Sequence, residues 1–413
     1  MQQVFVELYK YNDAWRATTP AERAGFVRNV SGSLSQLIRG GVEVIAFAVN
    51  DPGTDRRAPY DFFCVYLVPD RDAQREFERG IEESGWYRYF DQVNLSGAAM
   101  TPLAVLMANA ALAEPTAQPE PIPAAPRFTK RFARAHERTM AYLDEGHGRS
   151  VVFLHGDAMS SYLWRNVLPH VEGRGRLVAV DLIGAGDSDK LPDSGPGSYG
   201  FAEHAHYLGA LLDSLELGDE VVLVGHDWGA NLAVDWAMKN SDRVSGIVFG
   251  EALMPPFEWS DWPAEVRPEF EYLRTAEGER AVLEENYFVN NVQQAVLRRL
   301  SAAELAEIAR PYADPGEGRR PTITWPRSVP FGDDRTPTRE LLERQAEWMA
   351  TNPVPKLHFR GVPGALATGR RAAAISKWSN LTEVAVTGLH WTPEDDPHAI
   401  GSAVNTWIKD IRG

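Results

Sequence analysis

Apolar residues follow two different patterns in the two halves of this chain. Before residue 98, segments such as Val4–Tyr11 alternate apolar and polar positions. After residue 126, short continuous apolar runs such as Val151–Leu154 and Val221–Val224 alternate with helical segments. Alternation is typical of strands buried on one face, and continuous runs are typical of parallel strands buried on both faces. The pattern predicts two domains of different class.

The first domain, residues 1–97, reads as strand, helix, strand, strand, helix, strand. The predicted strands are 4–11, 42–49, 61–68 and 86–93, and the predicted helices are 20–38 and 71–83. This order is that of a ferredoxin-like α+β fold. Segments such as Gly85–Phe90 resemble an uncharacterised family of small dimeric α/β-barrel domains. The resemblance implies a homodimer through this domain, and we expect a structural or oligomerising role rather than a ligand site.

Residues 98–126 are expected to separate the domains. Prolines at nearly every second or third position of Glu114–Pro126 cannot continue a helix or pair in a central strand. This segment is therefore predicted to be a semi-rigid tether. Gly97–Ala113, rich in Ala, Leu and Met, is either a helix that closes the first domain or a disordered lead-in.

The second domain, residues 127–413, is predicted to be an α/β fold. A hairpin over 127–143 precedes buried strands at 151–154, 177–180, 221–224, 244–249, 356–359 and 383–386. Strands that alternate with helices imply a parallel sheet covered on both faces. Between about residues 255 and 349 only helical segments occur, and we interpret this insertion as a cap.

Composition excludes several classes of partner. The chain has 413 residues, is 44% hydrophobic and 24% charged, and has a net charge of −15. Such acidity argues against nucleic acid or an anionic membrane surface as a partner. The first residues lack the pattern of a signal peptide, and no apolar run is long enough to span a bilayer. The single cysteine, Cys64, is expected to be buried and unpaired, and a cytoplasmic location is the default expectation.

The most informative motif is Gly225-His226-Asp227-Trp228-Gly229, directly between a buried strand and a helix. In such a nucleophile elbow, the tight turn exposes the central side chain above the carboxyl edge of the sheet. That side chain is Asp227. A carboxylate is already charged and attacks carbon without a general base, leaving an ester. The motif predicts displacement at carbon.

Hydrolysis of that ester needs a base and an acid that orients it. His390, in a loop after the last strand, is the candidate base, and Glu251, after the strand that follows the elbow helix, is the candidate acid. Both positions are carboxyl ends of strands, where α/β sheets carry their sites. The alternative acid position, in residues 360–366, offers no carboxylate.

Two further features complete the predicted site. The backbone amides of Trp228 and of the loop 155–158 are placed to stabilise the oxyanion that forms when water attacks the ester. The indole N–H of Trp228 suits a leaving halide, although packing in the core is its alternative role. The histidines have no metal-ligand spacing, so neither a metal nor a cofactor is expected.

Residues 127–413 resemble the haloalkane dehalogenase family and its relative, Renilla-type luciferase. The matching segments include Phe153–Gly156, Asp181–Asp189, Gly225–Gly229, Arg320–Arg327 and Gly388–His390. The resemblance implies an α/β-hydrolase fold in which Asp227 is the nucleophile, His390 the base, Glu251 the acid and Trp228 a halide ligand. It implies the subgroup with its acid after the sixth strand, and as partners a small halogenated substrate, water and the halide product.

One position departs from that subgroup, which has Asn after His-Gly as a second halide donor where this chain has Asp157. An ionised Asp157 would repel a halide. Either Asp157 is protonated or another donor serves, and the cap tryptophans Trp259, Trp262 and Trp325 are candidates.

Hydrolytic dehalogenation is the leading hypothesis. A cofactor-independent luciferase-like oxygenase is the second, since Ala158 and parts of the cap are closer to those relatives. Epoxide hydrolysis is the third, and it requires cap tyrosines, for which Tyr272, Tyr287 and Tyr312 are the candidates. A non-catalytic receptor, which would bind without turnover, is the fourth.

Overall fold

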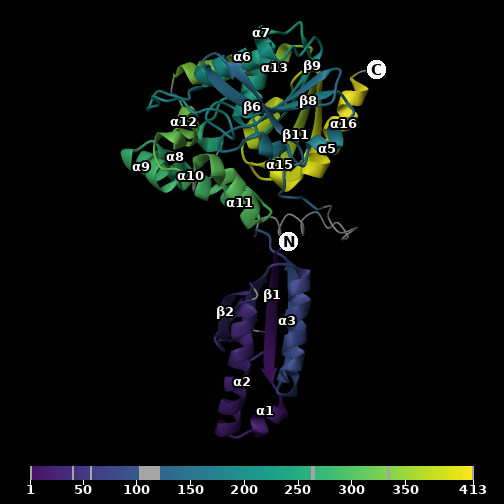
Figure 1. Ribbon diagram of the computed structural model, residues 1–413, viewed down its shortest axis with the longest axis vertical. Helices are drawn as coiled ribbons and strands as arrows, with labels where there is room; N and C mark the ends of the chain where they lie inside the picture. Colours follow the sequence, from purple (N-terminus) through teal and green to yellow (C-terminus); the bar gives the residue numbers. More distant parts are fainter. Residues whose placement is uncertain are drawn as a thin grey trace. The chain divides into compact units, whose positions relative to one another are not determined.

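The computed structural model describes residues 2–39, 41–55, 58–101, 121–261, 266–332 and 335–411. It divides into two compact units, Met1–Pro102 and Leu103–Gly413 (Figure 1). Most of the tether and of the possible helix Gly97–Ala113 lies outside the described residues, although Gly97 and Ala98 belong to a strand.

The N-terminal unit is a four-stranded antiparallel sheet with two long helices. Its strands are β1 (Gln3–Tyr11), β2 (Glu43–Val49), β3 (Phe62–Val68) and β4 (Phe90–Ala98), in the order β2-β3-β1-β4. Its helices are α1 (Asp13–Ala17), α2 (Pro20–Arg39) and α3 (Arg71–Glu83), with a 3₁₀ turn η1 (Trp86–Arg88). This strand order is the one expected of the ferredoxin-like α+β fold.

The last strand begins later than its aromatic residues suggest. Residues 86–93 were predicted to form it, but Trp86–Arg88 is a 3₁₀ turn after Gly85, whose φ of 74° requires the left-handed region. The strand begins at Phe90 and continues to Ala98. Trp86 is 8% exposed because it packs in the core, so its apolar character reflects burial and not strand conformation.

The two faces of this sheet differ in what covers them. Phe5, Tyr9 and Tyr66 alternate on one face and pack with residues of α2 and α3. On the other face Val6 is opposite Val65 and Leu95, and the β4 residues Val93 and Leu95 are 45% and 56% exposed. The second face is therefore apolar without a helix of its own unit over it.

The C-terminal unit is built on an eight-stranded sheet in the order β12-β11-β10-β9-β7-β8-β6-β5. The strands β8 to β12 and β7 are parallel, and β6 and β5 extend the sheet as the predicted antiparallel hairpin. The bounds are β5 (Lys130–Ala135), β6 (Arg138–Glu145), β7 (Ser150–Leu154), β8 (Arg176–Val180), β9 (Val221–His226), β10 (Val244–Gly250), β11 (Lys356–Pro363) and β12 (Leu381–Gly388).

Helices cover both faces of this sheet (Figure 1). One apolar cluster joins the sheet to α6 (Phe201–Ser214), α7 (Trp228–Lys239), α13 (Pro337–Thr351) and α14 (Gly369–Ile375). A second cluster joins it to η2 (Ser161–Trp164), α5 (Leu168–Val171) and α16 (Pro397–Asp410). The sheet is buried on both sides, as its continuous apolar strands predict.

Between β10 and α13 the chain forms the helical insertion. Its elements are η3 (Trp259–Asp261), α8 (Arg267–Leu273), α9 (Ala276–Glu285), α10 (Tyr287–Asn290), η4 (Val292–Ala295), α11 (Ala302–Ala309), η5 (Arg310–Tyr312), η6 (Glu317–Arg319) and α12 (Pro321–Ser328). Helix α13, which falls inside the predicted limit of about 349, instead packs on α7 through hydrogen bonds between Gln345 and Asn231. In the described part of the chain, no helix is long and apolar enough to cross a bilayer.

Candidate active site

Asp227 occupies a strained turn at the carboxyl edge of the sheet. It is the single residue between β9 and α7, and its φ of 55° and ψ of −132° lie in a region that costs a non-glycine residue about 1–3 kcal/mol. The side chain is buried and lines a cavity. The strand, turn and helix predicted around this residue are present, so the turn holds the carboxylate toward the cavity.

Three glycines make room for this turn. A Cβ on Gly225 would lie 2.4 Å from Ala230 Cα, and one on Gly229 would lie 2.3 Å from the Leu154 carbonyl oxygen. A Cβ on Gly156, in the facing loop, would lie 2.1 Å from Asp227 Oδ2. Each distance is far below van der Waals contact, so only glycine lets the two loops approach the carboxylate.

The backbone polarises one oxygen of this carboxylate. The Asp157 amide donates to Asp227 Oδ2 over 2.9 Å, and the Trp228 amide also donates to the carboxylate. Burial raises the pKa of Asp227, while His390 and these two amides act in the opposite direction. The second oxygen, Oδ1, faces His390. The arrangement separates an oxygen held by amides from an oxygen free to attack.

His390 lies between two carboxylates in the loop that follows β12. Its Nε2 is 3.9 Å from Asp227 Oδ1 and its Nδ1 is 3.7 Å from Glu251 Oε2. Burial alone would lower the pKa of His390, but the neighbouring Glu251 and Asp227 outweigh it and the net pKa is raised. The three residues that the sequence pointed to therefore meet around one imidazole.

Glu251 follows β10 and is fully buried, with a φ of 48°. Its Oε2 accepts hydrogen bonds from the amides of Ala365 and Leu366, over 3.0 and 2.6 Å. These amides belong to the loop after β11, which has no carboxylate of its own. Residues 360–366, the alternative position for the catalytic acid, thus supply backbone amides that hold Glu251, and Glu251 itself follows the neighbouring strand β10.

Asp157 is buried beside the nucleophile. Its Oδ1 accepts from the Ala158 amide over 2.6 Å, whereas its Oδ2 has no partner among the described residues. Burial, and secondly the charge of Asp227, raise the pKa of Asp157 well above its ordinary value. These surroundings favour the neutral acid, which carries one hydroxyl that can donate.

Trp228 lines the catalytic cavity, whereas the candidate cap tryptophans Trp259 and Trp325 do not. Trp228 lines the cavity and stacks on Trp325, with ring centroids 4.7 Å apart. Neither Trp325 nor Trp259 lines the cavity, since Trp325 lies behind Trp228 and Trp259 stacks on Phe331. Trp262 lies outside the described residues. The described cap tryptophans therefore do not provide the second donor.

The cavity has a volume of about 570 Å³ and mostly apolar walls. Its cap side also carries Glu269, Asn291 and Gln294, which sequence reasoning did not identify. Glu269 accepts a hydrogen bond of 2.9 Å from Tyr287. Short helical segments give no signal of which side chain points inward, so these residues could not be found from spacing.

His226 is a second residue that sequence reasoning left without a role. Its Nε2 lies 2.7 Å from the carbonyl oxygen of His390, and it is fully buried beneath the catalytic loop. Its place inside the Gly225–Gly229 motif was the available signal. This contact links the elbow to the histidine loop.

The cap also holds the His390 loop. The amides of His390 and Trp391 both donate to the carbonyl oxygen of Ala295, in the cap. From the other side of the loop, Asp395 accepts from the Leu389 amide and from two cap amides, residues 297 and 298. The position of the imidazole therefore depends on the cap as well as on β12.

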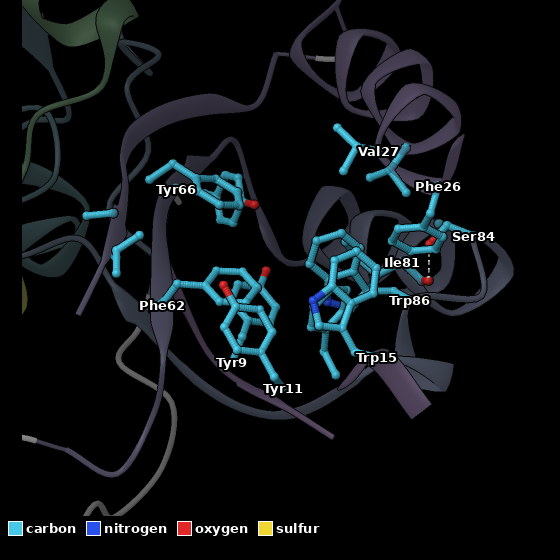
Figure 2. Close-up of a pocket in the computed structure, with 16 residues that line it drawn as sticks. Tyr9, Tyr11, Trp15, Phe26, Val27, Phe62, Tyr66, Ile81, Ser84 and Trp86 are labelled. Atoms are coloured by element: carbon cyan, nitrogen blue, oxygen red, sulfur yellow. Dashed lines mark hydrogen bonds between the residues drawn. The ribbon is translucent and has the colours of Figure 1, made fainter. Parts of the chain in front are cut away.

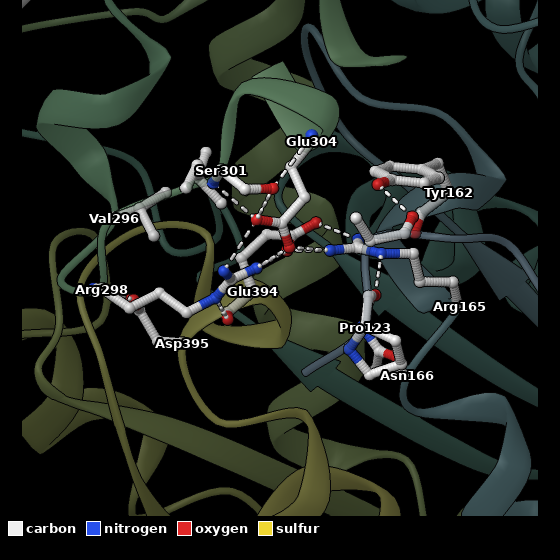
Figure 3. Close-up of polar contacts among 12 residues, drawn as sticks. Pro123, Tyr162, Arg165, Asn166, Val296, Arg298, Ser301, Glu304, Glu394 and Asp395 are labelled. Atoms are coloured by element: carbon white, nitrogen blue, oxygen red, sulfur yellow. Dashed lines mark hydrogen bonds and ion pairs between the residues drawn. The ribbon is translucent and has the colours of Figure 1, made fainter. Parts of the chain in front are cut away.

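A buried ion cluster of Arg165, Arg298, Glu304 and Glu394 fixes this junction (Figure 3). Arg165 pairs with Glu304 at 2.7 Å and Glu394 at 2.5 Å, and Arg298 pairs with the same two carboxylates at 2.7 and 2.6 Å. Arg298 and Glu304 come from the insertion, and the other two from the core. Arg165 also donates to the carbonyl of Pro123, so the end of the tether joins the cluster.

Comparison with known proteins agrees with this geometry. Residues 149–305 match the family described as alpha/beta hydrolase fold. A haloalkane dehalogenase of Sphingobium indicum is 46% identical over 290 residues, which are 70% of this chain and 98% of that protein. This chain belongs to the haloalkane dehalogenase family.

Further comparisons concern the fold of the C-terminal unit and the family of the N-terminal unit. The structure of haloalkane dehalogenase DbeA from Bradyrhizobium elkani matches with a TM-score of 0.65 and 36% identity, over 69% of this chain and 99% of that one. The coelenterazine h 2-monooxygenase of Renilla reniformis is 36% identical, over 65% of this chain and 87% of that protein. Residues 2–112 match a different family, of unknown function (DUF6616). The chain thus joins a dehalogenase-family unit to a domain of another family.

Proposed function

We propose that this protein hydrolyses the carbon–halogen bond of haloalkanes through an alkyl ester on Asp227. One observation carries the proposal: the buried Asp227 carboxylate lies between an apolar cavity and the His390–Glu251 pair. An apolar cavity of about 570 Å³ suits a small neutral substrate and removes the water that would shield the nucleophile.

In the first step, Asp227 Oδ1 attacks the carbon that bears the halogen. A carbon–oxygen bond forms while the carbon–halogen bond breaks, and the halide leaves with the bonding electron pair. The amide of Asp157 holds Oδ2, which fixes the direction of Oδ1. Trp228 lines the cavity, and its indole N–H is a donor that suits the leaving halide.

In the second step, His390 Nε2 takes a proton from water, and the resulting hydroxide attacks the ester carbonyl carbon. The amides of Asp157 and Trp228 now stabilise the oxyanion. As this intermediate collapses, the His390 imidazolium gives its proton to the departing alkoxide, which leaves as the alcohol, and the Asp227 carboxylic acid loses its own proton to solvent and becomes a carboxylate again. Glu251 stabilises the imidazolium and keeps the His390 proton on Nδ1.

Asp157 serves this reaction as a neutral acid. Asp157 lines the same cavity as Asp227 and Trp228, and its Oδ2 has no partner among the described residues, so a protonated Asp157 supplies the second donor to the departing halide. A neutral Asp157 can therefore replace the asparagine of the subgroup, because its hydroxyl donates a hydrogen bond to the halide, whereas a charged carboxylate would repel the halide.

The test is halide release from 1-chlorobutane and 1-bromobutane by the wild type, Asp227→Ala and His390→Phe. Asp227→Ala removes the nucleophile and is expected to release no halide above background. His390→Phe is expected to release one halide per chain and to gain the mass of one butyl group. Halide release by Asp227→Ala at the wild-type rate would refute the mechanism.

The same assays separate the alternatives. The Renilla relative supports a test for light emission with an imidazopyrazinone and oxygen, and emission without halide release would replace the dehalogenase proposal. Epoxide hydrolysis lacks support, because none of the candidate tyrosines Tyr272, Tyr287 and Tyr312 is among the described residues that line the cavity.

The N-terminal unit is proposed to form a homodimer. Its uncovered sheet face carries Val6, Val65, Val93 and Leu95, and two such faces can bury one another. Val93→Lys combined with Leu95→Lys places charges on this face and is expected to give a monomer in sedimentation, without loss of halide release. A wild-type monomer would contradict the proposal.

A further inference from the structure

A second cavity lies in the N-terminal unit, between the sheet and its helices (Figure 2). Its volume is about 390 Å³, within the range of small-molecule sites. The cavity is on the helix-covered face of the sheet, opposite the face proposed to dimerise. Its lining includes residues from all four strands and from α1, α2 and α3.

The walls of this cavity are aromatic and uncharged. The rings that line it are Tyr9, Tyr11, Trp15, Phe26, Phe47, Phe62, Tyr66, Trp86 and Phe90, and no charged side chain is among the described lining residues. Figure 2 shows the rings of Tyr9, Tyr11, Trp15 and Trp86 gathered on one side of the space. Such walls favour a flat neutral ring system, which stacks on aromatic faces and brings no charge to desolvate.

One buried donor in this wall has no acceptor. Trp86 is 8% exposed, and its indole Nε1 makes no hydrogen bond within the described residues. A buried N–H without a partner is unfavourable by roughly 1–3 kcal/mol. Ser84, which also lines the cavity, already donates to the Ile81 carbonyl oxygen over 2.6 Å. A ligand with an acceptor oxygen would satisfy the indole.

A glycine in the last turn of α3 keeps part of this space open. Gly80 lines the cavity from α3, and a Cβ added there would have no atom within 4 Å. Glycine in a helix interior costs about 1 kcal/mol relative to alanine. No steric need of the protein itself explains this residue, whereas a ligand in the cavity would.

A buried polar network fixes the floor of the cavity. The hydroxyl of Tyr9 donates to Glu7, and Gln92 donates to the other Glu7 oxygen over 2.6 Å. Burial raises the pKa of Glu7 to about 7. The hydroxyl of Tyr9 is therefore engaged by Glu7, whereas Trp86 Nε1 is a buried donor of this wall without a partner.

We propose that the N-terminal unit binds a neutral aromatic molecule of one or two fused rings, which stacks among these side chains and accepts a hydrogen bond from Trp86 Nε1. This site is separate from the catalytic cavity and goes beyond the proposed dehalogenase activity. It assigns a ligand class to a domain for which the sequence suggested a structural role.

The experiment is calorimetric titration of the full chain with coumarin, whose lactone oxygens accept hydrogen bonds, and with naphthalene, which has no acceptor. Gly80→Leu fills the cavity and is expected to weaken coumarin binding at least tenfold. Gly25→Leu, in α2 and outside the cavity lining, is the matched control and should bind like the wild type. Both variants should release halide at the wild-type rate.

Trp86→Phe keeps an aromatic ring, smaller than the indole, and removes the donor. Coumarin is expected to lose about fivefold more affinity than naphthalene, the value of one hydrogen bond. The proposal is overturned if the wild type binds neither compound, if Gly80→Leu binds coumarin as tightly as the wild type, or if Trp86→Phe weakens both compounds equally. Because Trp86→Phe enlarges the cavity where Gly80→Leu fills it, it also serves if Gly80→Leu does not fold.

Discussion

The two cavities of this protein share apolar walls but differ in what surrounds them. The catalytic cavity contains Asp227, Asp157 and His390, and Asp227 and Glu251 both have positive φ values. The N-terminal cavity has rings, one spare indole donor and a helical glycine, without a charged lining residue in its described part.

This difference indicates that the first cavity is suited to catalysis and the second to binding. Strained backbone and buried charge cost folding free energy, and they persist where reacting groups need a fixed position. A cavity without either feature lacks a nucleophile or a base, but its rings still offer contact area. The same chain therefore presents a site built for reaction and a site suited to binding alone.

After loss of the nucleophile itself, the largest effect is expected from Glu251→Gln. The glutamine oxygen can take the place of Oε2, which accepts from Ala365 and Leu366 and faces His390 Nδ1, but the negative charge that stabilises the imidazolium is lost. We expect halide turnover to fall on the order of 10⁴-fold. Loss of the negative charge also lowers the pKa of His390, so the acidic limb of residual activity should move to lower pH.

Glu383→Gln is the control for that prediction. Glu383 also contacts a buried histidine, with 3.1 Å between its Oε2 and His358 Nδ1, but it does not line the catalytic cavity. Rates measured from pH 5 to 9 should therefore be those of the wild type. Equal losses in the two variants would assign Glu251 a structural role only.

Gly156→Ala in the catalytic cavity is expected to reduce turnover, whereas Gly80→Ala in the N-terminal cavity is not. The new methyl group at residue 156 would displace Asp227 Oδ2 and the amide of Asp157. Loss of one oxyanion donor reduces turnover about 10²- to 10³-fold. Steady-state halide release by Gly156→Ala at the wild-type rate would contradict the described contact.

Asp157→Asn should have a moderate effect that depends on pH. The wild type is expected to lose kcat/KM as alkaline pH ionises Asp157, since its raised pKa keeps it neutral only below that value. The asparagine NH₂ donates at every pH, so the variant should match the wild type within about threefold at neutral pH. It should also lack the alkaline decline. An unchanged decline would show that another group titrates.

The smallest effect is expected from Gly80→Ala. Because a Cβ there meets no atom within 4 Å, the substitution should stabilise α3 by about 1 kcal/mol. Chemical denaturation followed by the signal of the N-terminal unit measures this gain, and halide release should not change. Destabilisation would mean that the glycine is needed for the fold itself.

Sequence reasoning succeeded where one local pattern determines the structure. The run Val221–Val224 and the motif after it specify a strand, a turn and a helix, and the Asp227 turn is where they predict it. The acid was harder to assign. Glu251 was identified by its place after a strand, but the amides of Ala365 and Leu366 that hold it come from a distant loop.

Other features depend on packing that no local pattern records. The apolar character of Trp86–Arg88 suggested a strand, whereas the segment is a 3₁₀ turn. The N-terminal cavity arises from how α2 and α3 pack on the sheet, and Gly80 within a helical pattern was its only local trace. Which cap side chains line the catalytic cavity, Glu269 among them, was likewise not readable from spacing.

The buried ion cluster has a consequence for the interchange of parts between relatives. Arg298 pairs with Glu304 inside the insertion, and Arg165 pairs with Glu394 inside the core. A foreign partner would therefore break the two pairs that cross the junction, Arg165–Glu304 and Arg298–Glu394. A chimaera that takes its cap from another dehalogenase must therefore inherit both arginines and both glutamates together, and this quartet sets the boundary at which recombination can be made.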